Sequence, residues 1–268
     1  MTKFEPDTML VHEVVPSPNH GERAGGRHPD MLLLHYTGME TGNEVLTRLC
    51  SPISEVSCHY FVTDDGCILQ LVPELRRAWH AGEGSWAGET DINSCSIGIE
   101  IVNPGHDFGY PDFPRRQIGA VAALCRAILR RHAIKPERIL AHSDTAPSRK
   151  KDPGEKFPWE VLYRSGIGHW VRPAPIKPGP SFGLGDSGDV IRALQSALHE
   201  YGYATPVTGH FDQQTHDVVT AFQRHFRPAL CDGRLDSSTL ITLRTLLEDI
   251  KGHRLPPAEP HTPLSPAS

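Results

Sequence analysis

The chain has 268 residues, enough for one large domain or for a medium-sized domain followed by a small one. Its formal net charge of −5, with 22% charged residues, offers no general surface for a polyanion, so we expect no nucleic-acid partner. Residues 1–7 contain acids and a proline where a signal peptide is basic and then apolar, and no apolar run is long enough to span a membrane.

The six cysteines form no CxxC pair, and Cys125 falls on the apolar face of a helical pattern. They predict free thiols in a reducing compartment, although the sequence alone leaves disulfides open. Together with the missing export signal, this favours the cytoplasm, with signal-independent export to the periplasm as the alternative. We also expect a monomer.

Residues 1–27 are rich in proline, glycine, histidine and charge, and they predict an irregular arm. Order is expected from the apolar run 31–34, which has the length of a strand buried on both faces and leads straight into His35. The following pattern predicts a short helix at 43–49 and two strands, 57–62 and 67–72, around a hairpin turn.

The segment 78–88 is too rich in glycine and tryptophan for regular structure, and its indoles, Trp79 and Trp86, suggest the wall of a ligand site. The next apolar run, 95–102, predicts a strand that contains one carboxylate, Glu100. A buried, unpaired carboxylate costs several kcal/mol as an anion, so Glu100 should pair with a cation or take up a proton.

A second histidine follows another predicted strand. Residues 117–132 predict an amphipathic helix, and the short apolar run 139–141 leads directly into His142. Two strands thus each deliver a histidine at the C-terminal end, the edge where open α/β sheets gather ligands. This coincidence is the main argument from the residues for a metal site.

The segment 142–154 supplies a third candidate ligand. His142 and Asp152 are ten positions apart (152 − 142), so the loop must fold back for both to reach one ion, and its prolines favour such a reversal. On its own, a histidine and an aspartate on one loop are more often solvated or capping groups. Two imidazoles and one carboxylate around Zn²⁺ would leave a fourth position open to water, which suits amide hydrolysis with Glu100 as the general base. Lys150 is placed to stabilise an oxyanion, or else is a solvated member of a basic run.

Four motifs, in this order and spacing, carry a resemblance to a known family: Leu34-His35-Tyr36-Thr37, Trp79-His80-Ala81-Gly82, Ser96-Ile97-Gly98-Ile99-Glu100, and His142-Ser143-Asp144 through Arg149-Lys150-Lys151-Asp152-Pro153-Gly154. Over about residues 28–170 the chain closely resembles the zinc-dependent N-acetylmuramoyl-L-alanine amidases of the type 2 amidase family, which includes bacterial cell-wall recycling amidases. The resemblance implies an α/β fold with a mixed central β-sheet flanked by helices. It also implies hydrolysis of the amide between N-acetylmuramic acid, or its anhydro form, and L-alanine in peptidoglycan or muropeptides.

The same resemblance implies roles for single residues. It implies zinc ligands at His35, His142 and Asp152, the catalytic acid/base at Glu100, and support of the oxyanion at Lys150. Contacts to the substrate are expected from Tyr36, Trp79 and Trp86, whereas His59 and His80 are expected to be structural or to line the groove.

Two other functions remain open at this point. A recognition protein could bind muropeptides without cutting them, although Asp152 argues against this because relatives described as non-catalytic lack a complete ligand set. A zinc peptidase that cuts within the stem peptide would use the same inorganic chemistry, so the metal residues alone do not separate it from an amidase.

A proline-rich joint, 172–182, separates the expected catalytic domain, 28–171, from a second domain, 183–250. Three short amphipathic helices are predicted in the second domain, with Asp212 near one start and Gly202 near one stop. The resulting three-helix bundle resembles a peptidoglycan-binding domain; the alternative is a bundle that only packs on the enzyme. The remaining prolines lie in a polar setting and predict a disordered tail over 251–268.

Overall fold

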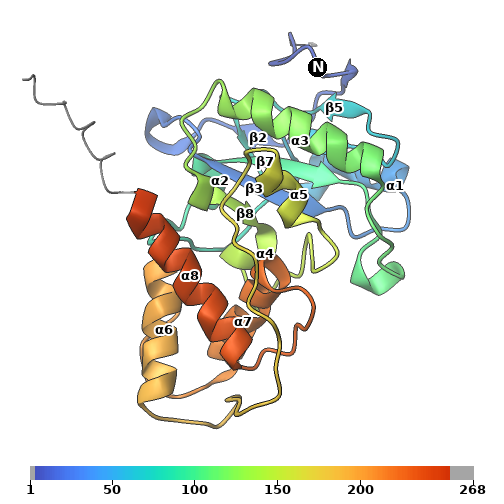
Figure 1. Cartoon of the computed structure of the whole chain (residues 1–268). Coiled ribbons are helices and arrows are strands. Elements are labelled where there is room, and N and C mark those ends of the chain that lie inside the picture. The colour runs from blue at the N-terminus through green and yellow to red at the C-terminus, as the bar shows by residue number, and fades with distance from the viewer. Residues whose placement is uncertain (1–3, 254–268) are drawn as a thin grey trace, which may run out of the picture.

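The computed structural model describes residues 4–253, and at its centre is a six-stranded mixed sheet (Figure 1). The strand order is β1-β5-β4-β7-β3-β8; β4 and β5 are antiparallel, and the other neighbouring pairs are parallel. In sheet order the strands span Glu13–Val14, Ile68–Gln70, Tyr60–Val62, Ser96–Ile101, Met31–Tyr36 and Ile139–Ala141. The expected mixed sheet is therefore confirmed.

Strand β3 lies between β7 and β8, and the four side chains of its apolar run, residues 31–34, are fully buried. A strand covered on both faces is apolar at every position, which is why this run shows no alternation. Helix α3 (Arg115–Leu129) packs on the sheet through the predicted apolar face. Inside that helix, the Gln117 side chain donates to the carbonyl oxygens of Val62 and Val102 and so ties α3 to the sheet.

The remaining elements around the sheet are short. They are α1 (Gly42–Leu49), α2 (Ile92–Cys95), α4 (His142–Thr145) and α5 (Trp159–Arg164), with 3-10 turns at Ala24–Gly26, Pro52–Ser54, His106–Phe108 and Pro136–Arg138. A second, two-stranded sheet pairs β2 (His20–Gly21) with β6 (Arg77–Ala78) in antiparallel fashion. The predicted helix at 43–49 and the predicted hairpin are thus present, although both hairpin strands are shorter than their apolar runs.

The N-terminal arm is more ordered than its composition suggests. Strand β1 pairs in parallel with β5, and Asn19 and Arg23 are buried. The Arg23 guanidinium donates to the carbonyl oxygens of Glu74, Asn93 and Ser96. Backbone pairing and buried hydrogen bonds of this kind require no apolar periodicity, so the arm looked irregular in the sequence.

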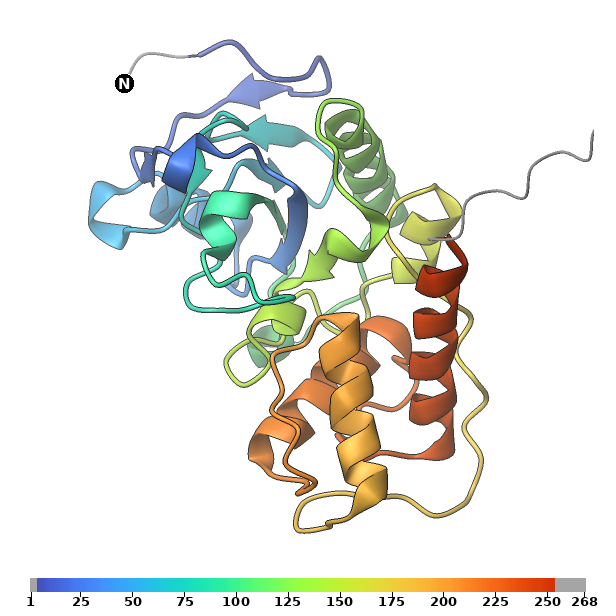
Figure 2. The same ribbon diagram turned by 90° about the vertical axis from the view of Figure 1, so that its left-hand side faces the viewer.

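The C-terminal part is the expected helical bundle, formed by α6 (Asp189–Tyr201), α7 (Gln213–Phe226) and α8 (Ser237–His253). The Asp212 carboxylate accepts a hydrogen bond from the Thr215 backbone N–H and caps α7. Helix α6 ends at Gly202, whose φ of 137° lies in a region that side chains disfavour. In Figures 1 and 2 the bundle lies below the sheet layer, and α4 lies between the two parts.

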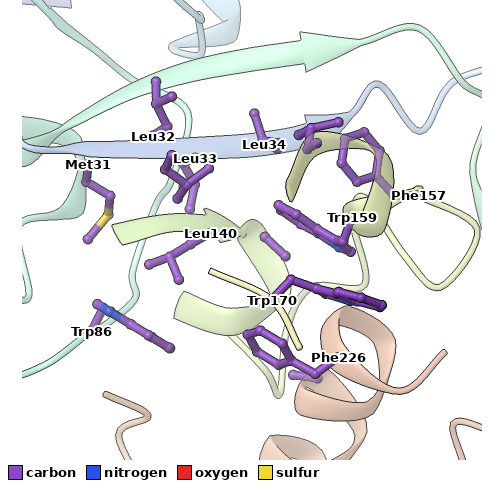
Figure 3. Close-up of a cluster of buried hydrophobic side chains, with 14 of the residues drawn as sticks. Met31, Leu32, Leu33, Leu34, Trp86, Leu140, Phe157, Trp159, Trp170 and Phe226 are labelled. Carbon is purple, nitrogen blue, oxygen red and sulfur yellow. The ribbon is translucent and has the colours of Figure 1, made fainter. Parts of the chain in front are cut away.

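One apolar core extends from the sheet into the bundle. Figure 3 shows buried side chains continuing from Leu32 of β3 and Leu140 of β8, past three tryptophans, to Phe226 of α7. Trp86 makes edge-on contacts with Tyr201 and Tyr203, with ring centroids 5.9 and 4.9 Å apart. The two parts therefore share a core across their junction.

The proline-rich joint runs along α8. The Ala174 backbone N–H donates to Thr242 Oγ1 at 3.0 Å, and Ser238 Oγ donates to the Ala174 carbonyl at 2.6 Å. Helix α8 continues to His253, and the tail predicted beyond it, 254–268, lies outside the described residues. Among the helices of residues 4–253, none is both long and apolar enough to cross a membrane.

Candidate metal centre

Three adjacent parallel strands bring the candidate residues to one edge of the sheet. His35 is at the C-terminal end of β3, and its partner in register on β7 is Glu100. On the other side of β3, Leu34 is in register with Ala141, so His142 follows at the level of His35. Paired residues on neighbouring strands point to the same face, which places these side chains around one point.

The loop after α4 folds back, as the ligand hypothesis requires. The Ser143 backbone N–H donates to the Asp152 carbonyl at 3.0 Å, and the Lys150 N–H donates to the Ala146 carbonyl at 2.9 Å. These backbone bonds close the loop, so that Asp152 returns to the turn that carries His142.

The three candidate ligands converge. His35 Nδ1 lies 2.9 Å from His142 Nδ1, and each of these nitrogens lies 3.0 Å from Asp152 Oδ2. The side chains are buried, with His35 1%, His142 2% and Asp152 6% exposed. Ligand atoms about 2 Å from a small cation stand roughly 3.3 Å apart in tetrahedral geometry. The two nitrogens and the carboxylate oxygen would therefore need to move apart only slightly to coordinate such a cation.

Hydrogen bonds on the far side of each ring determine which nitrogen carries the proton. The Nε2–H of His142 donates to the Ala81 carbonyl at 2.8 Å, because a carbonyl can only accept. A chain of bonds acts on His35 in the same way. The Ser96 hydroxyl donates to the Ile92 carbonyl at 2.5 Å and accepts from His80 Nε2–H at 3.3 Å; His80 Nδ1 then accepts from His35 Nε2–H at 3.0 Å.

Both Nδ1 atoms and Asp152 Oδ2 therefore face one another as hydrogen-bond acceptors, with no donor hydrogen among the three. Burial, the largest cause, and the neighbouring His142 lower the pKa of His35 to about 4, so His35 does not take up a proton at neutral pH to relieve this crowding. Burial alone would raise the pKa of Asp152, but His142 and His35 lower it below its usual value and keep the carboxylate ionised. A divalent cation supplies the missing positive charge, and these three residues could hold one.

A cleft of about 420 Å³ opens onto the three residues, and its lining includes Glu100, Lys150, Tyr36 and Trp79. The Oε2 atom of Glu100 is buried and has no hydrogen-bond partner among the described residues. Burial, the largest cause, and the Asp152 carboxylate raise the pKa of Glu100 well above its usual value, while Lys150 opposes that rise. Glu100 is thus a carboxyl group that can hold and release a proton beside the cluster.

The structure corrects the expectation for Trp86. Its indole is 1% exposed and does not line the cleft. The ring is instead enclosed at the junction with the bundle, where a Cβ added to Gly202 would lie 2.6 Å from Trp86 Cε2. A side chain covered in this way does not reach the cleft beside the three candidate ligands.

Sequence reasoning missed two side chains that shape the cleft, Arg149 and His106, and one contact of a third. His80 lines the cleft, as expected, and in addition orients His35. The Arg149 guanidinium donates to the carbonyl oxygen of Ala81 at 3.0 Å, the same oxygen that binds His142. His106 lines the cleft and bonds the Tyr36 hydroxyl at 3.0 Å. The sequence signal for His80 was its place beside Trp79, whereas His106 lies in a polar loop that carried none.

Comparison with known proteins matches residues 25–155 to the family described as N-acetylmuramoyl-L-alanine amidase, and residues 187–243 to a putative peptidoglycan binding domain. N-acetylmuramoyl-L-alanine amidase AmiD of Escherichia coli (strain K12) is 36% identical over 239 residues, covering 81% of this chain and 82% of that protein. The chain belongs to the N-acetylmuramoyl-L-alanine amidase family. The 1,6-anhydro-N-acetylmuramyl-L-alanine amidase AmpD of Citrobacter freundii is 32% identical over 163 residues, covering 54% of this chain and 84% of that protein.

Solved structures agree with this family membership. AmiD from E. coli, in complex with the substrate anhydro-N-acetylmuramic acid-L-Ala-D-gamma-Glu-L-Lys, superposes with a TM-score of 0.71 at 35% identity, covering 85% of this chain and 93% of that chain. AmpDh3 from Pseudomonas aeruginosa superposes with a TM-score of 0.70 at 33% identity, covering 85% and 94%. The family resemblance and the expected amidase activity, hydrolysis of the N-acetylmuramoyl-L-alanine amide, are confirmed.

Proposed function

We propose that His35, His142 and Asp152 hold a zinc ion with which the amidase hydrolyses the muramoyl-L-alanine amide. The observation that carries this proposal is the convergence of two Nδ1 atoms and one carboxylate oxygen, all within 3.0 Å of one another. Two nitrogens and one oxygen suit zinc better than magnesium or calcium, and they leave one tetrahedral position open. Zinc bound there supplies a Lewis acid for the substrate carbonyl and lowers the pKa of water to about 7.

Glu100 is proposed as the group that accepts the proton of the attacking water and delivers it to the leaving amine of L-alanine. Its position in register with His35 supports this role, as does the unpartnered Oε2 atom. A general base works best when its pKa lies near the operating pH, and burial moves the pKa of Glu100 in that direction.

Lys150 is proposed to stabilise the negative charge that develops on the carbonyl oxygen. Its side chain lines the cleft, and within residues 4–253 its ammonium has no hydrogen-bond or ion-pair partner. A cation that is already in place and not neutralised stabilises developing charge without reorganisation.

The proposed substrates are muropeptides, in which the muramic acid is anhydro or ordinary, and polymeric peptidoglycan. The anhydro form is supported by the ligand in the E. coli AmiD complex and by the name of the C. freundii relative. Tyr36 and Trp79 line the cleft and are proposed to contact the substrate. The helical bundle is proposed to bind glycan, on the strength of the domain matched at residues 187–243.

The decisive experiment follows the bond that is cut. The full chain is incubated with purified sacculi and, separately, with an anhydromuramoyl tripeptide, and each newly exposed amino terminus is identified. A new L-alanine terminus supports the proposal, and the ratio of the two rates shows which substrate is preferred. A different terminal residue would indicate a stem-peptide peptidase, and binding without any new terminus would indicate a recognition protein.

A cytoplasmic location and a monomeric state are also proposed. Fractionation of cells with markers for each compartment tests the location, with the periplasm as the alternative. Light scattering on the purified full chain tests the monomer.

A further inference from the structure

The bundle contacts the turn that carries His142 through a buried carboxylate, Asp144 of α4. Its Oδ1 accepts a hydrogen bond from the Tyr203 hydroxyl at 2.6 Å, and its Oδ2 accepts one from His225 Nδ1 at 2.6 Å. Tyr203 follows α6 and His225 lies in the last turn of α7, so both donors belong to the C-terminal part. Asp144 is 0% exposed, Tyr203 1% and His225 2%, so both hydrogen bonds are shielded from bulk solvent.

The same carboxylate holds the strand end from which the turn begins. Asp144 Oδ2 also accepts the backbone N–H of Ala141 at 2.8 Å. Ala141 is the residue before His142, and Asp144 is two residues after it (144 − 142). The backbone on both sides of His142 is therefore tied to one buried group, whose position depends on two donors from the bundle.

The same turn of α7 also approaches the other end of the loop. Arg224 forms an ion pair with Glu155, with 3.7 Å between Nε and Oε2. Glu155 is three residues after Asp152 (155 − 152), and its Oε2 also bonds His106 Nε2 at 3.1 Å. Two consecutive residues of α7 thus contact the two ends of the segment that supplies His142 and Asp152.

We propose that Tyr203 and His225 are positioning residues of the metal centre, acting through Asp144 to hold His142 in the orientation that a metal ion requires. This inference rests on the proposed metal ligands, and it makes the helical bundle a part of the catalytic unit in addition to any role in binding glycan. Partners that orient a ligand from outside the coordination sphere typically change metal affinity 10- to 100-fold. The alternative is that these contacts only add stability at the junction.

A matched pair of variants separates the two possibilities. Tyr203→Phe removes the hydroxyl that binds Asp144. Tyr201→Phe removes a hydroxyl that is also buried at the same junction, and that hydroxyl bonds His169 Nδ1 at 2.9 Å and makes no hydrogen bond to Asp144. Each change deletes one oxygen atom and leaves the ring in place, so both variants should fold, with similar losses in Tm.

The measurements are made on the full chain after its metal has been removed. Zinc affinity is determined by competition with a chromophoric chelator, and the geometry at the metal is followed by the visible spectrum of the Co²⁺-substituted protein. Tyr203→Phe should weaken zinc binding by about 10-fold and shift the Co²⁺ bands. Tyr201→Phe should match the wild type in both.

Two results would overturn the inference: wild-type zinc affinity and Co²⁺ spectrum in Tyr203→Phe, or equal weakening in both variants. His225→Gln and His169→Gln repeat the comparison with a second pair of buried histidines, each of which bonds a carboxylate at the junction. The wild-type protein separates this inference from the proposed function. If it binds no zinc, the metal proposal fails; if it binds zinc and the variants do not differ, only the positioning role fails.

Discussion

Replacing Gly98 with alanine tests the geometry of the proposed metal centre without touching a candidate ligand. Gly98 lies in β7, and a Cβ built there would stand 2.5 Å from Cγ and Nδ1 of His80. Ordinary carbon contacts are about 3.5–4.0 Å, so the His80 ring must move by roughly 1 Å. His80 is the acceptor for His35 Nε2–H, and a shift of that size breaks the bond.

The expected effects follow from two separate terms. Forcing a methyl group into a packed core costs about 1–3 kcal/mol, and losing the hydrogen bond to His35 costs about 0.5–1.5 kcal/mol. The free energy of unfolding of the metal-free Gly98→Ala protein should therefore fall by about 2–4 kcal/mol. Because His35 loses the partner that directs its Nδ1 lone pair inward, zinc affinity should fall by about 10- to 100-fold.

Urea unfolding of the metal-free protein measures the first effect, and zinc competition well below the unfolding transition measures the second. Gly119→Ala is the matched control, because Gly119 lies on an exposed position of α3 where an added Cβ meets nothing within 4 Å. The control should gain about 0.5–1 kcal/mol from helix propensity and bind zinc normally. A Gly98→Ala protein that keeps the zinc affinity of the wild type would refute the orienting role of His80.

Three further outcomes are expected from single substitutions. Asp152→Ala should abolish tight zinc binding, and unchanged zinc content by mass spectrometry would contradict the ligand assignment. Glu100→Gln should keep zinc but lose about 10²- to 10⁴-fold in kcat, and wild-type turnover would remove Glu100 from the mechanism. Burial would raise the pKa of Glu74, but hydrogen bonds led by those from His132 and Arg131 lower it to about 2, from an ordinary value of 4.5. The stabilisation from this lowered pKa is present above pH 4.5 and is lost as the pH falls towards 2. Glu74→Gln should therefore lower the free energy of unfolding by about 3 kcal/mol at pH 7. In a plot of that free energy against pH, the variant should show a weaker fall on the acid side than the wild type.

The histidines could be located from the sequence because each follows a short apolar run that has the length of a buried strand. The run 31–34 forms most of β3, whose C-terminal end carries His35, and the run 139–141 forms β8, which His142 follows at the same sheet edge. The level at which they meet was not predictable, since the Leu34–Ala141 register depends on how the two strands pair. Periodicity shows which face of a strand is buried, but it does not show which residue of another strand lies opposite.

The error at Trp86 has a related cause. Tryptophan on a glycine-rich loop is common at ligand sites, but the partner that covers Trp86, Tyr203, is 117 positions away (203 − 86). No local pattern connects two segments so far apart. The sequence likewise did not predict the hydrogen bond between Asp144 and His225. A helical bundle has the same sequence pattern whether it hangs on a flexible linker or packs on the enzyme.

The packing of the junction also constrains the bundle in its proposed role of binding glycan. Separating the two parts would expose the Trp86 indole and leave the Asp144 carboxylate without two of its donors, and each buried hydrogen bond to a charged group is worth about 1.5–3 kcal/mol. The proline-rich joint is therefore not what determines the distance between the parts, because the buried contacts already do so. Any glycan bound by the helices would therefore lie at a fixed position relative to the cleft. Only amide bonds at a matching distance along that glycan could then enter the cleft. A tethered domain would instead raise the local concentration of wall material without selecting among bonds.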